Sequence, residues 1–502
     1  MKESHNKMQF LNKTISQNLI NKLLCLFFVI SIIGIYITCI DKVNALPYLI
    51  LGIGIASLFY LFSPKIRLYS PIFCITVSSL ISYIIAPLYY FHEYFNVKKN
   101  PAYLFSDIFI EINTIYVLFF ISLFFPIIFY LIKFSKQKWK GKSNIFKNVP
   151  SSSTKYLNFL FIVVNVLFLL FIISAIIYSG MSFFQVFLLN AKFRNITSNG
   201  FFGFVRVIFT FLILLTYVFA LKQFFCKNIK ISKFNLIFLA INLFLWSFMN
   251  GGRSFLIFSV FFTFILMYIF FNKKILLRNI LIFALMGLVM LTYSIIQAKY
   301  RASSELDYIN KNITKKESEG ILYSLIERSD AFPNSVEFFK YLKKRYDGIF
   351  EYTDYRLGHQ ILVHYTTLAP KPIRQIISND PNYFYGFNAL LTLKIFPEVF
   401  ESKVGFDFGL VSNLYYNLGI FAIVIGGILL GLFTRLCEIL FKSYINKDSF
   451  ILLYMLFLYP FFTTVLNIGI INSPNIIAWF ITIPLLVIIV CIANLKIKIK
   501  LK

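Results

Sequence analysis

The chain has 502 residues, of which 59% are hydrophobic and 14% are charged, and its mean hydropathy is +0.76. Soluble domains are about 45–50% apolar and about 25% charged, so this composition excludes a soluble protein. The apolar residues form long continuous blocks, which also excludes disordered, collagenous, disulfide-scaffold and membrane β-barrel classes. The predicted fold class is an all-α polytopic integral membrane protein.

Twelve apolar blocks are each close to the roughly 20 residues that a helix needs to cross a bilayer. The predicted spans are residues 23–40, 47–62, 70–90, 108–132, 156–179, 204–221, 234–249, 255–271, 280–297, 411–434, 450–467 and 476–493. We therefore expect three regions. Residues 1–297 would hold nine transmembrane helices with short loops, residues 298–410 a large extracytoplasmic loop with short helices, and residues 411–502 three more helices and a basic cytoplasmic tail.

The net charge of +28 is explained by topology. If the N-terminus is cytoplasmic, the inner segments carry 27 Lys and Arg residues, whereas the short outer loops carry 6. Cytoplasmic loops are enriched in Lys and Arg, so both termini are predicted to be cytoplasmic. Little positive charge is then left for nucleic acid, and no partner of that class is expected.

The cysteines do not suggest a disulfide or a metal site. All six are predicted in spans or on the inner side: Cys25, Cys39, Cys74, Cys226, Cys437 and Cys491. We therefore expect no extracytoplasmic disulfide. Because no Cys and His cluster has ligand spacing, no zinc or other metal is expected.

The long loop at 298–410 differs from the rest of the chain, because it holds fourteen of the twenty-one acidic residues and both His359 and His364. A loop of this length is uncommon unless it is functional. Within it, residues 321–346 have amphipathic helical spacing that is interrupted near Pro333, and residues 351–368 have the pattern of another helix. The chemistry is therefore expected in this region.

Several basic residues are predicted on the outer face. Arg253 lies in the turn at 250–254, and Lys299 and Arg301 lie where the ninth span ends. Arg356 and His359 are three residues apart, which places them within about 60° on one helical face. Arginine is suited to bidentate phosphate recognition, so this set predicts a site for a lipid pyrophosphate.

Each of these residues also has an ordinary interpretation. Basic residues at span ends can be interfacial anchors, and single histidines are usually surface residues. Arg206 and Glu111 lie inside apolar runs, where an ionisable side chain usually faces a polar interior, so both are weaker candidates. Asp107 precedes the fourth span, where a helix cap is expected.

The second half of the chain resembles the oligosaccharide repeat-unit polymerases, also called O-antigen or Wzy-type polymerases, of bacterial surface-polysaccharide assembly. Three stretches carry the resemblance: NGGRSFLIFSVFF at 250–262, YFYGFNALLTLKIFPEVFESKV at 383–404, and LVSNLYYNLGIFAIVIGGILLGLF at 410–433. The family often has a Pro-Arg pair where this chain has Phe396-Pro397-Glu398, and the nearest basic residue there is Lys403.

The resemblance implies an architecture similar to that of GT-C glycosyltransferases, in a bacterial cytoplasmic membrane. It implies an inverting, metal-independent enzyme without a cofactor that makes a surface polysaccharide such as the O-antigen of lipopolysaccharide or a capsule. A glycan linked to undecaprenyl pyrophosphate would be transferred to the non-reducing end of another lipid-linked repeat unit, among membrane lipids and with a chain-length regulator protein as a further partner. The implied roles are catalysis by His359 and Arg356, pyrophosphate binding by Arg253, Arg301 and Lys299, and support from His364, Asp354 and Arg206.

Three other functions remain open at this point. An O-antigen ligase would use the same donor and the same kind of Arg and His site with a different acceptor. A lipid-linked oligosaccharide flippase or exporter would distribute charges through its spans and have short loops, whereas here the charges inside spans are few and one outer region holds most of the acids. A non-catalytic scaffold would tolerate loss of every candidate residue.

Overall fold

A computed structural model of the chain describes residues 14–67, 70–92, 108–133, 152–182, 274–276, 332–346, 387–395 and 408–444, together with isolated positions beyond them. The chain divides into two compact units. The first comprises residues 17–140 and 325–477, and the second comprises residues 1–16, 141–324 and 478–502. Both units therefore combine segments that are far apart in the sequence.

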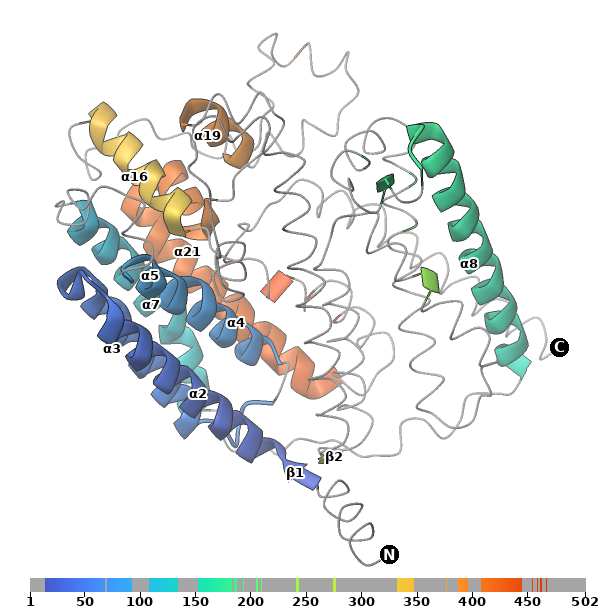
Figure 1. Cartoon of the computed structure of the whole chain (residues 1–502). Coiled ribbons are helices and arrows are strands. Elements are labelled where there is room, and N and C mark those ends of the chain that lie inside the picture. Colours follow the sequence, from blue (N-terminus) through green and yellow to red (C-terminus); the bar gives the residue numbers. More distant parts are fainter. Residues whose placement is uncertain are drawn as a thin grey trace, which may run out of the picture. The chain divides into compact units, whose positions relative to one another are not determined.

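The described elements are mostly helices, drawn in Figure 1. The unit of residues 17–140 and 325–477 contains α2 (Gln17–Thr38), α3 (Lys42–Leu61), α4 (Pro71–Leu80), the π-helix η1 (Ile81–Ile85), α5 (Ala86–Tyr90), α7 (Ile108–Lys133), α16 (Phe332–Tyr346), α19 (Phe387–Ile395) and α21 (Gly409–Tyr444). The other unit contains β1 (Thr14–Ser16), α8 (Ser152–Ser179) and β2 (Lys274–Leu276).

Six predicted spans are confirmed as apolar helices long enough to cross a membrane. They are Asn18–Thr38, Lys42–Leu61, Pro71–Tyr90, Ile108–Lys133, Ile162–Ser179 and Gly409–Ser443. The chain is therefore a membrane-embedded α-helical protein. The spans predicted at 204–221, 234–249, 255–271, 280–297, 450–467 and 476–493 lie outside the described ranges except for single positions, so the count of twelve stays a prediction.

The first two helices begin earlier than the apolar runs predicted, because polar residues form their first turns. Helix α3 begins at Lys42, where Asp41 caps it by accepting a hydrogen bond from the Asn44 N–H at 3.0 Å. Helix α2 ends at Thr38, which corrects the placement of Cys39 inside the first span. Cys39 lies in the turn between α2 and α3 and forms an isolated β-bridge with His92.

The third span contains a π-helical turn that the sequence analysis did not predict. Ser70 caps α4 by accepting a hydrogen bond from the Phe73 N–H at 3.4 Å. At η1 the helical hydrogen bonds span one residue more than in an α-helix, so that the Ala86 N–H donates to the carbonyl of Ile81. The widened turn lies directly before Pro87, which has no N–H to continue an α-helical ladder.

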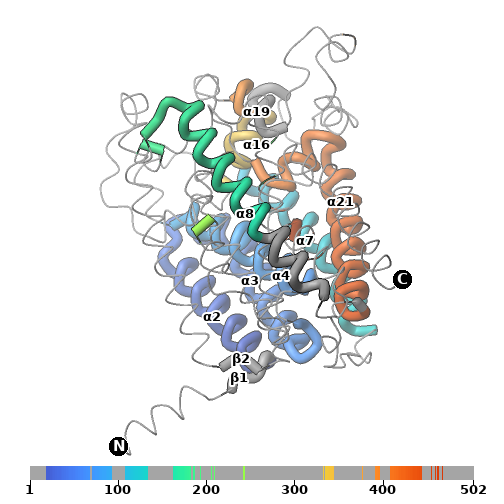
Figure 2. Tube along the Cα trace, turned by 90° about the vertical axis from the view of Figure 1, so that its right-hand side faces the viewer, coloured from blue at the N-terminus to red at the C-terminus, as the bar shows by residue number. Residues whose placement is uncertain are grey.

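Helices α7 and α21 lie side by side (Figure 2). They pack closely because glycines of α21 face the backbone of α7. A Cβ atom at Gly427 would lie 2.7 Å from the Cβ atom of Ser122. A Cβ atom at Gly431 would overlap the carbonyl of Leu123 and lie 3.1 Å from the ring of Pro126. Glycines four residues apart allow two transmembrane backbones to approach, and this contact joins distant parts of the sequence.

Replacing Gly431 with alanine should therefore destabilise the protein by about 1–3 kcal/mol, because one backbone must move away from the other. Gly34 in α2 is a matched control, since a Cβ atom there meets nothing within 4 Å. Gly34→Ala should leave stability unchanged or raise it by up to about 1 kcal/mol. Equilibrium unfolding of the purified variants in mixed detergent micelles measures both effects. Equal destabilisation at the two positions would contradict the packing argument.

The unit that contains α8 is held partly by an amide pair between two predicted spans. Asn242 donates from Nδ2 to the side-chain oxygen of Asn165 at 2.8 Å and to its backbone oxygen at 3.1 Å, and both residues are buried. Such hydrogen bonds hold transmembrane helices together. The same unit also contains β1 and β2, which form a short antiparallel pair with Ile15 opposite Ile275.

Several contacts join segments that are far apart in the sequence. The two paired strands both fall in segments predicted to be inner. Asn113, near the start of the predicted fourth span, donates to the carbonyl of Asn44, just before the predicted second span, at 3.2 Å. At the opposite end, Lys65 donates to the carbonyl of Leu131 at 3.5 Å. The side of the membrane on which each contact lies stays a prediction.

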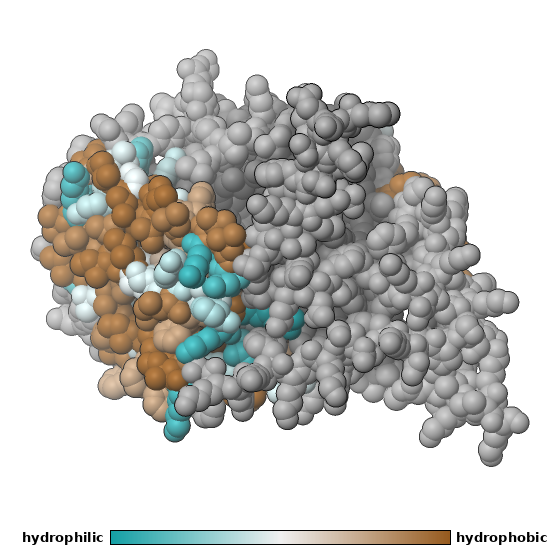
Figure 3. Space-filling model, turned by 90° about the horizontal axis from the view of Figure 1, so that it is seen from below, coloured by the Kyte–Doolittle hydropathy of each residue, from teal (hydrophilic) through white to brown (hydrophobic). Residues whose placement is uncertain are grey.

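Hydrophobic side chains cover much of the described surface, shown in brown in Figure 3. On α2, for example, Phe27, Ile30 and Ile37 are exposed. Helix α7 contrasts with α2, because most of its aromatic side chains are buried among other helices. The exposed face of α2 is what a membrane-embedded protein presents to lipid tails.

Candidate functional site

Helix α16 lies with α19 over one end of the helical bundle in Figure 1, and an aromatic cluster anchors α16 there. Phe332, the first residue of α16, is only 2% exposed. Its ring centroid lies near four others, at 5.8 Å from Tyr48, 5.4 Å from Tyr90, 6.2 Å from Phe91 and 5.6 Å from Tyr116. These edge-to-face geometries are favourable for aromatic rings. We call these five residues the aromatic anchor.

Further contacts fix α16 along its length. The buried Ser335 hydroxyl donates to the carbonyl of Phe408 at 2.6 Å, directly before α21. The rings of Phe338 and Phe339 pack on α21 with centroid distances of 6.2 Å to Tyr416 and 5.4 Å to Tyr415, respectively. Part of the predicted amphipathic helix at 321–346 is therefore confirmed, with Pro333 in its first turn.

Glu111 has a structural role that the sequence did not predict. It lies in the first turn of α7, and its carboxylate is 3.3 Å from the Lys343 ammonium on α16. Its side chain is 22% exposed, so it lies at the end of the bundle and not deep in an apolar run. A carboxylate near a helix N-terminus is also favoured by the helix dipole. The pair joins α16 to α7, although the two residues are more than two hundred positions apart in the sequence.

The start of α21 is a separate helical segment that lies beside α16. Gly409 and Gly419 have positive φ angles of 76° and 59°, and the helix breaks at Leu418 and Gly419. Glycine adopts this conformation without a steric penalty. Before the break, Asn417 donates to the carbonyl of Asn413 at 2.7 Å. The stretch Asn417-Leu418-Gly419, part of the family resemblance, thus ends this segment and redirects the chain into the span.

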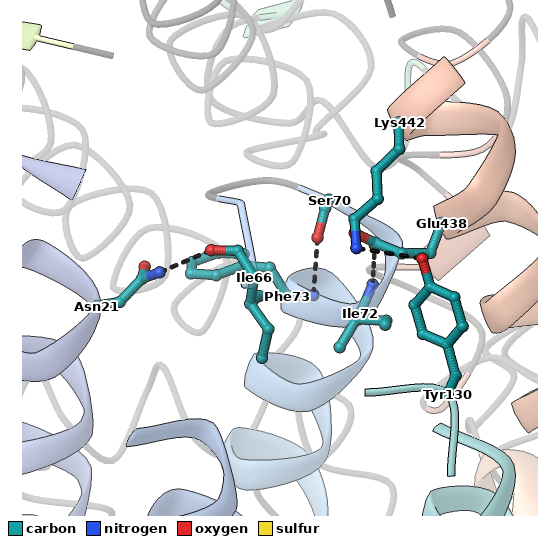
Figure 4. Close-up of polar contacts among 8 residues, drawn as sticks. All are labelled: Asn21, Ile66, Ser70, Ile72, Phe73, Tyr130, Glu438 and Lys442. Carbon is teal, nitrogen blue, oxygen red and sulfur yellow. Dashed lines mark hydrogen bonds and ion pairs between the residues drawn. The ribbon is translucent and has the colours of Figure 1, made fainter. Parts of the chain in front are cut away.

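A second polar cluster lies at the opposite end of the same unit, where Glu438 on α21 is completely buried. Its Oε2 accepts a hydrogen bond from the Ile72 N–H at 3.2 Å, in the first turn of α4 (Figure 4). Its Oε1 is 3.7 Å from the Lys442 ammonium, which donates to the Tyr130 hydroxyl at 3.1 Å. This carboxylate therefore links α21, α4 and α7 in one polar network.

Sequence analysis missed this network, although a signal for it was present. Glu438 is a single acidic residue within an apolar stretch, and such residues usually have a specific partner. Lys442 lies four residues later, one helical turn away on the same face. What the sequence could not indicate is the third partner, the N-terminus of α4, which lies more than 360 residues away.

The eight residues that the sequence assigns to the catalytic, pyrophosphate-binding and supporting roles lie outside the part of the chain that the structure describes. They are Arg206, Arg253, Lys299, Arg301, Asp354, Arg356, His359 and His364. Lys403 lies outside it too, as does the helix predicted at 351–368. Their roles therefore stay predictions. Within the described ranges, no group of three or more His, Cys, Asp or Glu side chains could hold a metal ion.

Described helices flank part of the predicted site in the sequence. Helix α16 ends at Tyr346 and α19 begins at Phe387, so packed helices bound both ends of the segment that carries Arg356 and His359. In comparisons with known proteins, no family model, curated protein or solved structure matches the chain.

Proposed function

We propose that the chain is a polymerase of lipid-linked oligosaccharide repeat units in the bacterial cytoplasmic membrane. The observation that carries the proposal is the set of basic residues predicted on the outer face, where the short loops carry only 6 Lys and Arg residues against 27 in the inner segments. Arg253, Arg301 and Arg356 are the central members of this set. The three stretches that resemble repeat-unit polymerases include the turn that carries Arg253.

The proposed reaction assigns a task to each kind of residue. A sugar hydroxyl of the acceptor attacks the anomeric carbon of the donor, and the bond from that carbon to the pyrophosphate oxygen breaks with inversion. His359 takes the hydroxyl proton as general base. The arginines, with Lys299, stabilise the negative charge that develops on the departing pyrophosphate. Asp354, His364 and Arg206 support these groups.

The described helices support the proposal because they are packed in place next to the segment that carries the proposed catalytic residues in the sequence. A catalytic group must be held in place when the transition state forms, and sites next to packed elements are held better than sites in long free loops. The contacts of α16 with α7 and α21 anchor the chain ten residues before Arg356. Helix α19 lies on the other side of the same segment in the sequence and has Thr392 fully buried.

The test is a reconstituted assay with purified undecaprenyl-pyrophosphate-linked repeat units, with product length measured on a gel. Wild type should give a ladder of longer lipid-linked glycans. Arg253→Ala, Arg356→Ala and His359→Ala should each lower the rate by about a hundredfold or more, as the loss of one group that stabilises the transition state does. Lys340→Gln is the matched control, because Lys340 pairs with Glu337 on α16 and should not affect the reaction.

Other outcomes would replace the proposal with one of its alternatives. Transfer of a glycan to a different acceptor, without a ladder, would indicate a ligase. Movement of unmodified lipid-linked oligosaccharide across the bilayer, without a new glycosidic bond, would indicate a flippase. Full activity in all three variants, measured on folded protein, would remove the assigned residues from the site.

A further inference from the structure

The first segment of α21, residues 409–417, folds back on the rest of the helix. A Cβ atom at Gly426 would lie only 2.8 Å from each of the two methyl carbons of Leu414. In a straight helix these two positions would be about 18 Å apart along the axis. The chain therefore turns sharply at Leu418 and Gly419, where the dihedral angles are not helical. In membrane proteins, polar substrates commonly bind where a transmembrane helix is interrupted in this way.

Two asparagines lie one helical turn apart directly before the break. Asn417 donates from Nδ2 to the backbone carbonyl of Asn413 at 2.7 Å and to its side-chain Oδ1 at 3.0 Å. Both side chains are partly exposed, but the Oδ1 atom of Asn417 is covered and has no hydrogen-bond partner within the described part of the chain. A covered amide oxygen without a partner lowers stability. The pair therefore has hydrogen-bonding capacity that the fold does not use.

Helix α16 holds the segment that carries these asparagines. Tyr415 and Tyr416, between the two asparagines, pack on aromatic rings of α16, which lies over this end of the unit in Figure 1. The segment is also fixed at its start, because the Ser335 hydroxyl binds the carbonyl of Phe408. A group that is already held in place costs less conformational entropy when it binds a ligand. The asparagines are thus presented on a rigid support.

The chemistry of this region suits a neutral ligand that is rich in hydroxyl groups. Residues 409–434 contain no charged side chain, so this stretch offers no counter-charge to a pyrophosphate. Amide side chains supply N–H donors and an oxygen acceptor, and a sugar hydroxyl can pair with both. The bond from Asn417 to the Asn413 carbonyl is an ordinary local contact of an asparagine near a helix end. It does not explain why a second amide is placed beside the first.

We propose that Asn413 and Asn417 bind hydroxyl groups of the glycan in the lipid-linked substrate, and so recognise its sugar part. The identity of the ligand rests on the proposed polymerase function. On binding, the Asn417 amide turns from Asn413 towards the glycan, because its Oδ1 atom is covered in the structure. A sugar hydroxyl then donates to this oxygen, and the side-chain N–H groups of the pair donate to sugar oxygens.

The binding experiment uses the full-length protein in a detergent without a sugar headgroup. The probe is the repeat-unit oligosaccharide, released by mild acid from the lipid-linked substrate of the elongation assay, and saturation-transfer NMR measures its dissociation constant. Asn417→Leu and Asn413→Ala should each weaken binding about fivefold to tenfold, the loss expected for one or two neutral hydrogen bonds. Asn21→Leu is the matched control and should bind as wild type does, because Asn21 is a fully buried amide that bonds the carbonyls of Ser63 and Ile66 at the predicted inner end.

The elongation assay separates failure of this inference from failure of the proposed function. Asn417→Leu should raise the KM for the repeat unit about tenfold and change kcat by less than about twofold, whereas His359→Ala lowers kcat. Elongation with unchanged KM and unchanged oligosaccharide affinity in both asparagine variants overturns the inference and leaves the polymerase in place. Asparagine-dependent binding without elongation supports the sugar site and overturns the polymerase. The inference also falls if wild type does not bind the oligosaccharide, or if Asn21→Leu loses as much affinity.

Discussion

Replacing Glu438 with alanine is expected to lower the free energy of unfolding by about 3–5 kcal/mol, the usual cost of removing one partner from a buried ion pair. Glu438 is fully buried, and the Lys442 side chain is only 15% exposed. The substitution leaves the Ile72 N–H and the Lys442 ammonium without this carboxylate. Equilibrium unfolding in mixed detergent micelles gives the measurement.

Three further variants show whether charge pairing is the cause. Glu438→Gln keeps the volume and an acceptor for the Ile72 N–H, so it should cost less than Glu438→Ala. Adding Lys442→Met to Glu438→Gln should recover part of the loss, because removal of both charges avoids an unpaired ammonium. Glu337→Gln breaks a partly exposed pair on α16 and should change stability by less than about 1 kcal/mol. Additive effects of the Glu438 and Lys442 substitutions would show that the two groups do not interact.

Replacing Phe332 with alanine is the other change with a large expected effect. The substitution empties the centre of the aromatic anchor, and the loss of a buried phenylalanine costs about 3–5 kcal/mol. Because Phe332 is at the start of α16, the loss should appear first as local opening of that helix. Hydrogen exchange of the amides in 332–346 should speed up by at least about a hundredfold, while α7 amides near Tyr116 keep their protection.

Phe421 is the matched control, because it is 71% exposed on α21 and has the same side chain. Phe421→Ala should change stability by less than about 0.5 kcal/mol and leave the exchange of α16 unaltered. If the proposed site depends on the scaffold, Phe332→Ala should also slow glycan elongation, whereas Phe421→Ala should not. Unchanged exchange of α16 in Phe332→Ala would mean that Ser335 and Lys343 hold the helix without the aromatic anchor.

Glu438 and Phe332 lie at opposite ends of the same unit. At one end the aromatic anchor and the Glu111–Lys343 pair join α16 to the membrane helices. At the other end Glu438 joins α21 to α4. Helix α21 runs between the two ends and packs on α7 through Gly427 and Gly431. The glycine contact therefore lies between the aromatic anchor at one end of the unit and the Glu438 network at the other.

The candidate site could be predicted only as a set of residue types on one side of the membrane. Charge statistics place Arg253 and Arg301 outside, and helical spacing places Arg356 near His359. Neither pattern gives a distance between Arg253 and Arg356, because about a hundred residues separate them. The role of Glu111 shows the same limit: its apolar neighbours predicted a polar interior, and its partner Lys343 lies in a segment that no local pattern connects to α7.

Hydropathy along the chain is enough to assign the membrane-protein class and the positions of most of the described helices. A bilayer selects for apolar stretches of a set length, so hydropathy marks α7 almost to the residue. The tertiary structure alone decided which helices meet. Contacts such as Phe332 with Tyr48, Gly431 with Leu123 and Glu438 with Ile72 depend on packing between residues far apart in the chain. Hydropathy records only the preference of each residue for lipid or water, and it does not record which neighbour a residue will contact.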